Sequence, residues 1–371
     1  MFSDNMSGFC NGSKLEPSQA YFYDGGEALL ITMVMPFILV LGLCCNIAFL
    51  FVVYRVPWMR TIPNTYLFNL AIADTLFLIV AVGEKLFRFG SSPYHDDWAP
   101  VGTMGCVLVP AIMSCCYYTS ITLVSLVSLE RFDAICRPLK HRQFSSKNRV
   151  LKLVAGAWTG SLILASLQIP DYSILKLYCA LPPNNTGELT VMKKHLPIII
   201  GQCKPVAAWL DPFVNSIQTI PFIIAMFGNA FLYCRIVLAV KRSTREAQQN
   251  GLSGQNLRNR NRVTRMLITN GVLFFLCLSP FELTSFLFVV WELATGSLAM
   301  LITPSMMVWI QIARILMYFN SAVNPIVYNI TNPRYRTASK QAFCLKHAHT
   351  SNNEYTQPTA THIVKTALTP E

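Results

Sequence analysis

Long apolar stretches alternate with short polar connections along most of the chain. Seven of these stretches are suitable for membrane-spanning helices, because about 20 mostly apolar residues cross a hydrocarbon core of about 30 Å. They cover residues 28–54, 65–87, 103–136, 150–170, 212–240, 263–291 and 301–330. Lipid admits only helices and closed barrels, and these stretches are too long for barrel strands. We therefore predict an all-α membrane protein with a bundle of seven transmembrane helices.

Polar segments flank the apolar stretches and complete the predicted organisation. Residues 1–27 are polar and precede a seven-helix domain over residues 28–332. Residues 333–345 place apolar side chains opposite Arg and Lys at helical spacing, which predicts a short amphipathic helix on the membrane surface. The juxtamembrane Cys344 either carries a palmitoyl group or stays an unmodified thiol. Residues 346–371 are rich in Ser and Thr and predict a disordered tail.

The composition agrees with a chain that mostly avoids water, and the charges set its direction. Only 13% of the residues are charged and 53% are hydrophobic, against roughly 25% and 45–50% in soluble domains. The formal net charge is +12, and Lys and Arg concentrate in the connections after the first, third and fifth stretches and in the tail. The positive-inside rule then predicts an extracellular N-terminus and a cytosolic C-terminus. This distribution argues against a nucleic-acid partner.

Several residues on the predicted extracellular side are candidates for modification. Asn5, Asn11 and Asn184 each begin an Asn-X-Ser/Thr triplet, the acceptor for N-glycosylation. Four cysteines also fall on this side, in the oxidising compartment where disulfides form, and four allow three pairings. These cysteines are Cys10, Cys106, Cys179 and Cys203.

Polar residues lie at similar depths in the first, second, third and seventh apolar stretches. Because polar groups are costly inside lipid, such residues are usually functional. Asp74 lies near the middle of the second stretch, and its oxygen atoms with those of its neighbours would suit a small hard cation such as Na⁺. The alternative is a structural network that holds the helices together. The set comprises Asn46, Asp74, Ser120, Asn320, Ser321 and Asn324, and no other cofactor is indicated.

The sequence offers no support for catalysis. Its six histidines lie in predicted loops or in the tail and show no metal-ligand spacing. Neither a Gly-rich nucleotide loop nor a nucleophile elbow occurs. A channel or transporter is an alternative class, but the sequence lacks the inverted repeats and broken midplane helices of transporters. We therefore do not expect an enzyme.

Several motifs follow one another along the seven stretches and together resemble those of the rhodopsin-like (class A) G-protein-coupled receptors. The resemblance covers the whole seven-helix region. Its residues are Asn46, the Asn-Leu-Ala-Ile-Ala-Asp run that ends at Asp74, Trp98 ahead of Cys106, Glu130-Arg131-Phe132, Trp158, Pro221, Cys277-Leu278-Ser279-Pro280 and Asn324-Pro325-Ile326-Val327-Tyr328.

The resemblance implies a mechanism and partners. A ligand bound from outside would shift an equilibrium between two states, and a heterotrimeric G protein would bind the cytosolic face that the sixth helix opens. Arg131 would contact the G protein, and Ile121, Pro221 and Phe274 would form a core that repacks. Receptor kinases and arrestin are expected partners of the Ser/Thr-rich tail. The remaining residues of the activation motifs are Glu130, Pro280, Pro325 and Tyr328.

The resemblance also implies a disulfide between Cys106 and the second extracellular loop. Family spacing relative to Pro221 favours Cys203 as the partner, and Cys179 is the alternative. The cysteine that is left over could pair with Cys10.

Some positions depart from the family pattern. Leu278 replaces the usual Trp of the sixth helix, and Phe132 replaces the Tyr that usually follows Arg131. Arg260 stands where many members carry an acidic partner for Arg131. We therefore expect a weaker ionic restraint on the inactive state.

The outer halves of the helices bear on the ligand. Met113 stands where amine receptors of this family carry an Asp, and Tyr318 stands where visual pigments carry the retinal lysine. Neither an amine nor retinal is therefore expected. Charges of both signs occur there instead, and they either form internal salt bridges or bind a ligand with both polarities, as a peptide has. The candidate contacts are Glu84, Ser114, Phe281, Glu282, Ser285 and Arg314.

The stretch from Arg314 to Pro325 is similar to the seventh helix of the thyrotropin-releasing-hormone receptors and their neuropeptide-receptor relatives. In that group the Arg at the position of Arg314 contacts the peptide. We therefore expect a plasma-membrane receptor for a neuropeptide, surrounded by membrane lipid. A receptor of the same fold for a lipid or small anionic ligand, with Arg314 as the counter-charge, is the alternative.

Overall fold

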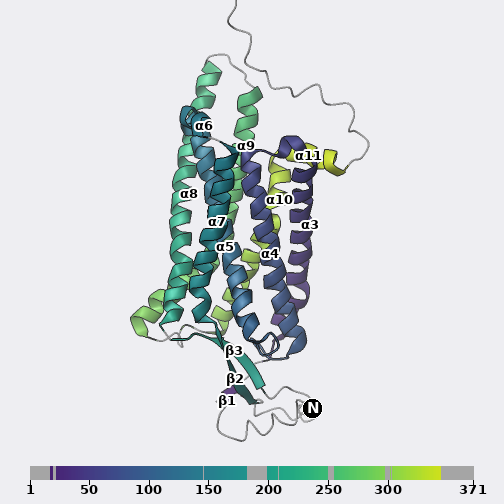
Figure 1. Ribbon diagram of the computed structural model, residues 1–371, viewed down its shortest axis with the longest axis vertical. Helices are drawn as coiled ribbons and strands as arrows, with labels where there is room; N and C mark the ends of the chain where they lie inside the picture. Colours follow the sequence, from purple (N-terminus) through teal and green to yellow (C-terminus); the bar gives the residue numbers. More distant parts are fainter. Residues whose placement is uncertain are drawn as a thin grey trace, which may run out of the picture.

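Seven long helices form one bundle in the computed structural model (Figure 1). The structure describes residues 17–19, 22–144, 146–181, 199–207, 209–249, 255–296, 301 and 303–343. Within these residues seven helices are long and apolar enough to cross a membrane, which confirms the seven-helix prediction. The candidates Asn5, Asn11, Asn184, Cys10 and Cys344 lie outside the described residues.

The two ends of the bundle differ in structure. A small β-sheet lies at one end, called here the sheet end, and helix α11 lies at the other, called the α11 end (Figure 1). The bundle consists of α2 Gly25–Leu29, the π-helical η1 Leu30–Val34, α3 Met35–Arg55, α4 Ile62–Ser91, α5 Gly102–Cys136, α7 Lys147–Gln168, α8 Leu210–Gln249, α9 Gln255–Thr295 and α10 Pro304–Thr331. Short helices η2 Pro57–Met59, α6 Pro138–Phe144, η3 Ile169–Asp171 and α11 Pro333–Phe343 complete the helical part.

Small residues allow close approach between neighbouring helices of the bundle. A Cβ atom added to Gly42 of α3 would collide with the Leu78 side chain of α4 and lie 3.2 Å from the Ala322 side chain of α10. Because lipid tails are as apolar as Leu, helices in a membrane associate through such packing rather than through a hydrophobic drive. Large apolar side chains such as Phe37 and Phe227 point outward and remain exposed, as expected for a lipid-facing surface.

Two helices extend beyond the predicted apolar stretches at the α11 end. Helix α8 continues to Gln249, and α9 begins at Gln255. The connecting segment is rich in Arg, Gln and Asn, of which Arg and Gln are good helix formers that can extend a helix into water. Most of the residues between the fifth and sixth stretches therefore continue the flanking helices.

The sheet connects three segments of the chain. Strands β2 Ile174–Leu181 and β3 Ile199–Lys204 form an antiparallel pair, and β1 Pro17–Gln19 adds to β2 in parallel. The structure contains the expected disulfide between Cys106 at the start of α5 and Cys203 on β3, with Cα atoms 5.6 Å apart. Cys179 on β2 is disulfide-bonded as well. The N-terminal segment thus takes part in the sheet, which the sequence pattern did not predict.

Helix α11 packs against α3 and also contacts η2 and the start of α4. The Tyr335 hydroxyl donates a hydrogen bond to Asn64 Oδ1, and Trp58 Nε1 donates to Gln341 Oε1 at 3.0 Å. Ring centroids of Phe51 and Phe343 lie 5.4 Å apart. A helix therefore occupies the region where an amphipathic one was predicted; its position on a bilayer surface stays a prediction.

Candidate functional site

A cavity of about 520 Å³ opens at the sheet end, among α4, α5, α9, α10 and strand β3. Four of the six predicted ligand contacts line this cavity, namely Glu84, Ser114, Phe281 and Arg314. Glu282 and Ser285 are not among its lining residues. Met113 and Tyr318, which argued against an amine and against retinal, also line it. The sequence pattern did not predict that strand β3 and the connection over residues 92–101 also line this cavity.

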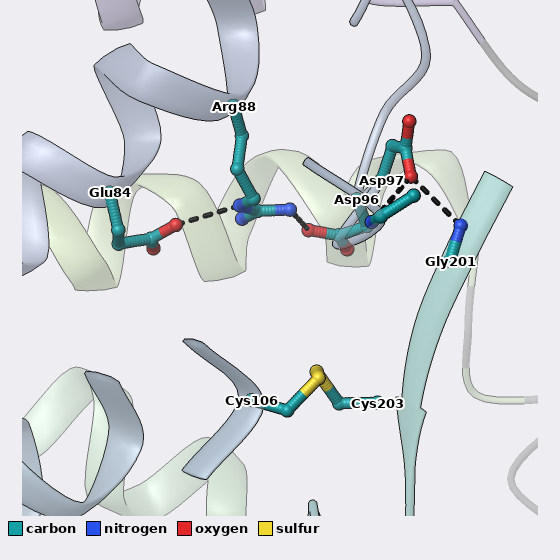
Figure 2. Close-up of a disulfide and its surroundings, with 8 residues drawn as sticks. Glu84, Arg88, Asp96, Asp97, Cys106, Gly201 and Cys203 are labelled. Carbon is teal, nitrogen blue, oxygen red and sulfur yellow. Dashed lines mark hydrogen bonds and ion pairs between the residues drawn. A yellow bond between two sulfur atoms is a disulfide. The ribbon is translucent and has the colours of Figure 1, made fainter. Parts of the chain in front are cut away.

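Arg88 holds the centre of a charged network on one wall of the cavity (Figure 2). Its Nε donates to Glu84 Oε2 at 2.7 Å, one helical turn away, and its Nη1 donates to Asp96 Oδ1 at 3.1 Å. The guanidinium lies 4.4 Å from the ring centroid of Trp98, within the range of a cation–π contact. Lys85 Nζ lies 3.6 Å from Glu84 Oε1 and 3.8 Å from Asp96 Oδ1. Glu84 and Arg88 are four residues apart on one helix, a spacing that favours such an ion pair.

Asp96 is the most exposed member of this network. Its side chain is 50% exposed, and its backbone adopts a left-handed conformation with φ of 54°. Partial burial would raise the pKa of Asp96, but the positive charges of Lys85, His95 and Arg88 outweigh that effect and hold the pKa well below its usual range. The Asp96 carboxylate is therefore ionised throughout the physiological pH range.

Asp97 fastens strand β3 to the connection between α4 and α5. Its Oδ1 accepts hydrogen bonds from the backbone N–H of Gly201 at 2.8 Å and of Ala99 at 2.9 Å (Figure 2). The Trp98 N–H in turn donates to the Gly201 carbonyl at 2.8 Å. A Cβ on Gly201 would lie 2.6 Å from the Ala99 nitrogen, so only glycine fits here. Together with the Cys106–Cys203 disulfide, these contacts fix β3 beside the cavity.

Replacing Asp97 by Ala should lower the free energy of unfolding by about 1.5–3 kcal/mol, because two backbone donors lose a charged acceptor in a buried place. The measurement is the thermal unfolding midpoint of the purified protein. Asp97→Asn keeps one acceptor oxygen and should fall between Asp97→Ala and the native protein. Equal midpoints for Asp97→Ala and the native protein would exclude this anchoring role.

Glu282 forms a separate buried contact between three helices. Its side chain is 1% exposed, and its Oε1 accepts from the Tyr117 hydroxyl of α5 at 2.6 Å and from Gln218 Nε2 of α8 at 3.2 Å. Glu282 and Arg314, which lie on neighbouring spans and carry opposite charges, do not form an ion pair. The sequence pattern pointed to a charged partner for Glu282, whereas the uncharged donors Tyr117 and Gln218 both bind its Oε1.

Most members of the predicted polar network meet in the middle of the bundle. Asp74 is 1% exposed, and its oxygens accept from Asn324 Nδ2 at 2.7 Å and from Ser120 Oγ at 3.4 Å. Asn320 and Ser321 line the same cavity of about 20 Å³ beside the Asp74 carboxylate. Asn46 stands one step away, because its Nδ2 donates to the Gly42 and Ser321 carbonyls at 3.0 and 2.9 Å.

The arrangement of these residues along seven helices agrees with a comparison against family models. Residues 45–328 match the model of the 7 transmembrane receptor (rhodopsin family). The chain belongs to the rhodopsin family of seven-transmembrane receptors. Members of this family are receptors rather than enzymes, so the absence of catalytic motifs is accounted for.

Curated relatives of the receptor cover most of its length. It is 27% identical to mouse neuromedin-U receptor 2 over 315 residues, which is 84% of this chain and 74% of the relative. It is 25% identical to mouse somatostatin receptor type 2 over 336 residues, with 90% and 82% coverage. Rat somatostatin receptor type 4 is 26% identical over 334 residues, with 89% and 78% coverage. These relatives support the class A peptide-receptor resemblance, while the resemblance to thyrotropin-releasing-hormone receptors stays a prediction.

The activation motifs of the receptor lie toward the α11 end. Glu130 Oε1 lies 3.6 Å from His141 Nδ1 of α6, and Arg131 forms no ion pair with any residue that the structure describes. Arg131 lines a cavity of about 330 Å³ together with Asn64 and Tyr335. The Arg260 side chain lies outside the described part of the chain. The weaker ionic restraint expected from the sequence agrees with this geometry and stays a prediction.

The residues predicted to repack on activation lie between the cavity at the sheet end and the cavity at the α11 end. Ile121, Phe274 and Tyr328 are buried in one apolar cluster, together with Phe222, which follows Pro221. Ring centroids of Phe222 and Phe275 lie 5.7 Å apart, which brings α8 against α9. Pro221, Pro280 and Pro325 lie inside α8, α9 and α10, respectively. Their part in activation stays a prediction.

Proposed function

We propose that the receptor binds a peptide at the sheet end and activates a heterotrimeric G protein at the α11 end. The observation that carries the proposal is the cavity of about 520 Å³ with carboxylates and cations on its walls. A peptide offers charges of both signs and hydrogen-bonding backbone groups to such a cavity. The relatives support the same class of ligand, since their names identify receptors for neuromedin U and somatostatin.

The decisive experiment is a screen of the expressed receptor against a neuropeptide library and a lipid extract, with calcium and cAMP as the readouts. We expect a response to one peptide or a few related ones, with no response in cells that lack the receptor. A response to lipid extract alone would favour the alternative ligand class. A ligand-dependent current without G protein would favour a channel instead.

The proposed orientation places the sheet end outside the cell and the α11 end in the cytosol of the plasma membrane. Basic residues near the α11 end support it through the positive-inside rule, among them Arg55, Arg60, Arg137 and Lys140. The Cys106–Cys203 disulfide at the sheet end also suits an oxidising compartment. Epitope tags at the two termini provide the check, since only the N-terminal tag should bind antibody on intact cells.

Signalling would follow from a shift between two states that the peptide binds with different affinities. The Glu282 contact lies at the level where α5, α8 and α9 meet, so relative movement of α9 would change it. Arg131, which lines the cavity at the α11 end, would then contact the G protein. Receptor kinase and arrestin would act on the Ser/Thr-rich tail, and lipid would contact α11 and a palmitoyl group on Cys344. Glycans on Asn5, Asn11 and Asn184 complete the proposal.

A Na⁺ ion beside Asp74 is a further part of the proposal. The residues present fit such an ion, because the cavity of about 20 Å³ next to the carboxylate also receives Ser120 and Asn320. The Asn320 Oδ1 atom is buried without a hydrogen-bond partner, which leaves an oxygen ligand free. Asp74, Ser120 and Asn320 would therefore hold the ion, whose charge would neutralise the buried carboxylate.

Sodium should raise the thermal unfolding midpoint of the purified receptor relative to an equal concentration of N-methyl-D-glucamine chloride. A sodium concentration ten times the dissociation constant of the site would stabilise the receptor by about 1.4 kcal/mol through mass action. Asp74→Asn should abolish the difference between the two salts, while Asp211→Asn, which changes an exposed carboxylate, should preserve it. The same midpoint in both salts would rule out a sodium site.

A further inference from the structure

The charged side chains that line the cavity do not balance. Its walls hold two carboxylates, Glu84 and Asp96, and four cations, Lys85, Arg88, Lys204 and Arg314. The cavity therefore carries an excess of two positive charges, since four cations face two carboxylates. A ligand that enters it meets a surplus of one sign rather than an even mixture.

The ion pairs decide which of the cations are available. Arg88 forms ion pairs with Glu84 at 2.7 Å and with Asp96 at 3.1 Å, and Lys85 lies close to the same two carboxylates. Within the described residues, Arg314 and Lys204 form no ion pair, and neither side chain donates a hydrogen bond. The two surplus charges can thus be assigned to Arg314 on α10 and Lys204 on β3.

The positions of these two cations suit recognition of an anionic group. Both side chains are partly withdrawn from water, and a charge taken from water is costly unless a partner compensates it. Lys204 follows Cys203 directly, so the disulfide to α5 holds it beside the cavity. A guanidinium such as that of Arg314 offers paired donors that match a carboxylate.

The carboxylates of the cavity, in contrast, leave little for a cationic ligand. Glu84 is already within 3.6 Å of Lys85 and hydrogen-bonded to Arg88. Met113 contributes no charge from α5. A cationic group of the ligand would have to displace Arg88 or Lys85 from Glu84. An anionic group could bind Arg314 and Lys204 without breaking an ion pair of the receptor.

We propose that Arg314 and Lys204 bind a carboxylate of the ligand, so that the receptor selects peptides with a negatively charged group. This inference rests on the proposed function of the cavity as a peptide site. The carboxylate comes either from a free C-terminus or from an Asp or Glu side chain, and both present the same chemistry to the two cations.

Four peptide pools test the inference and separate the two sources. The pools are of equal length and combine a free or an amidated C-terminus with the presence or absence of Asp and Glu. Activity of both free-acid pools, with or without Asp and Glu, supports a terminal carboxylate. Among the amidated pools, activity only where Asp and Glu are present supports a side-chain carboxylate. Activity of the amidated pool without Asp and Glu, at equal potency, overturns the inference.

Charge-removing variants then locate the contact. With the active pool as the probe, Arg314→Gln should raise the half-maximal concentration about 10- to 100-fold, as expected for a lost charge-assisted hydrogen bond. Lys204→Gln should raise it less, by about 3- to 10-fold, because Lys is a point charge without the paired donors of Arg. Lys176→Gln is the matched control, since Lys176 is exposed on the neighbouring strand β2 and does not line the cavity.

Two further results distinguish misfolding and failure of the wider proposal. Arg314→Lys keeps the charge, so it should retain the preference for carboxylate-containing pools even where its potency falls. An unchanged preference in both Arg314→Gln and Lys204→Gln, with normal surface expression, overturns the inference while the peptide-receptor function stands. Silence of every pool and of a whole-tissue peptide extract contradicts the peptide-receptor function itself.

Discussion

Replacing Arg88 by Met should lower the free energy of unfolding of the receptor by about 3 kcal/mol, the lower end of the range for a broken buried ion pair, because the Glu84 carboxylate keeps only Lys85, 3.6 Å away, as a charged partner. The Arg88 side chain is 1% exposed, and Glu84, its partner at 2.7 Å, is only 7% exposed. Loss of the guanidinium also removes the contact with the Trp98 ring at 4.4 Å. The thermal unfolding midpoint and the amount of receptor at the cell surface are the measurements.

Two variants control for this effect. Arg55→Met makes the same substitution at an exposed position of the α11 end and should change stability by no more than about 0.5 kcal/mol. A double variant with Glu84→Gln and Arg88→Met removes both charges of the pair and should recover part of the loss. If Arg88→Met unfolded at the native midpoint, the network around Arg88 would have no structural role.

Replacing both Cys106 and Cys203 by Ser should cost about 2–4 kcal/mol of stability and strongly weaken the response to the ligand. The disulfide closes a segment of sequence separation 97 and is the covalent link between β3 and α5. Without it, β3 would be held beside the cavity by non-covalent contacts such as the hydrogen bonds through Asp97 and Trp98. Lys204 would then lose its fixed position, so half-maximal response should require far more ligand.

The response should also fall when the native receptor is treated with a reducing agent, and the fall should be smaller in the double variant, where the disulfide of Cys179 is still open to reduction. Cys136→Ser is the matched control, because Cys136 is a free cysteine at the α11 end. Normal potency of the double variant would mean that the hydrogen bonds alone suffice to place β3.

The bundle could be predicted from the sequence because the bilayer imposes a length on each helix. A run of about 20 apolar residues has few other structures available in lipid, whatever its neighbours are. The end of α8 at Gln249 and the start of α9 at Gln255 were less predictable, because these residues lie beyond the apolar stretches and the thickness of the bilayer does not set their length. Strand β1 could not be predicted because Pro17–Gln19 is short and polar, and its pairing with β2 defines it.

The site could be predicted only in part. The sequence gives the charge of each side chain, but it does not show toward which neighbouring helix each side chain points. Arg314 and Glu84 reach the cavity as expected, whereas Glu282 turns toward Tyr117. The register that decides this depends on how α9 packs against α5 and α8, which a single helix does not specify. Lys204 escaped notice because its place depends on a hairpin whose two strands are separated by residues 182–198.

The attachment of α11 bears on how a shortened receptor for crystallography should be designed. Chain removal after Thr331, at the end of the seventh spanning helix, would strip Asn64 and Trp58 of their partners Tyr335 and Gln341. It would also expose apolar rings near Phe49 to detergent, so aggregation should follow. A truncation placed after Phe343 keeps the contacts of Tyr335 and Gln341 and is the better starting point for a crystallisable fragment.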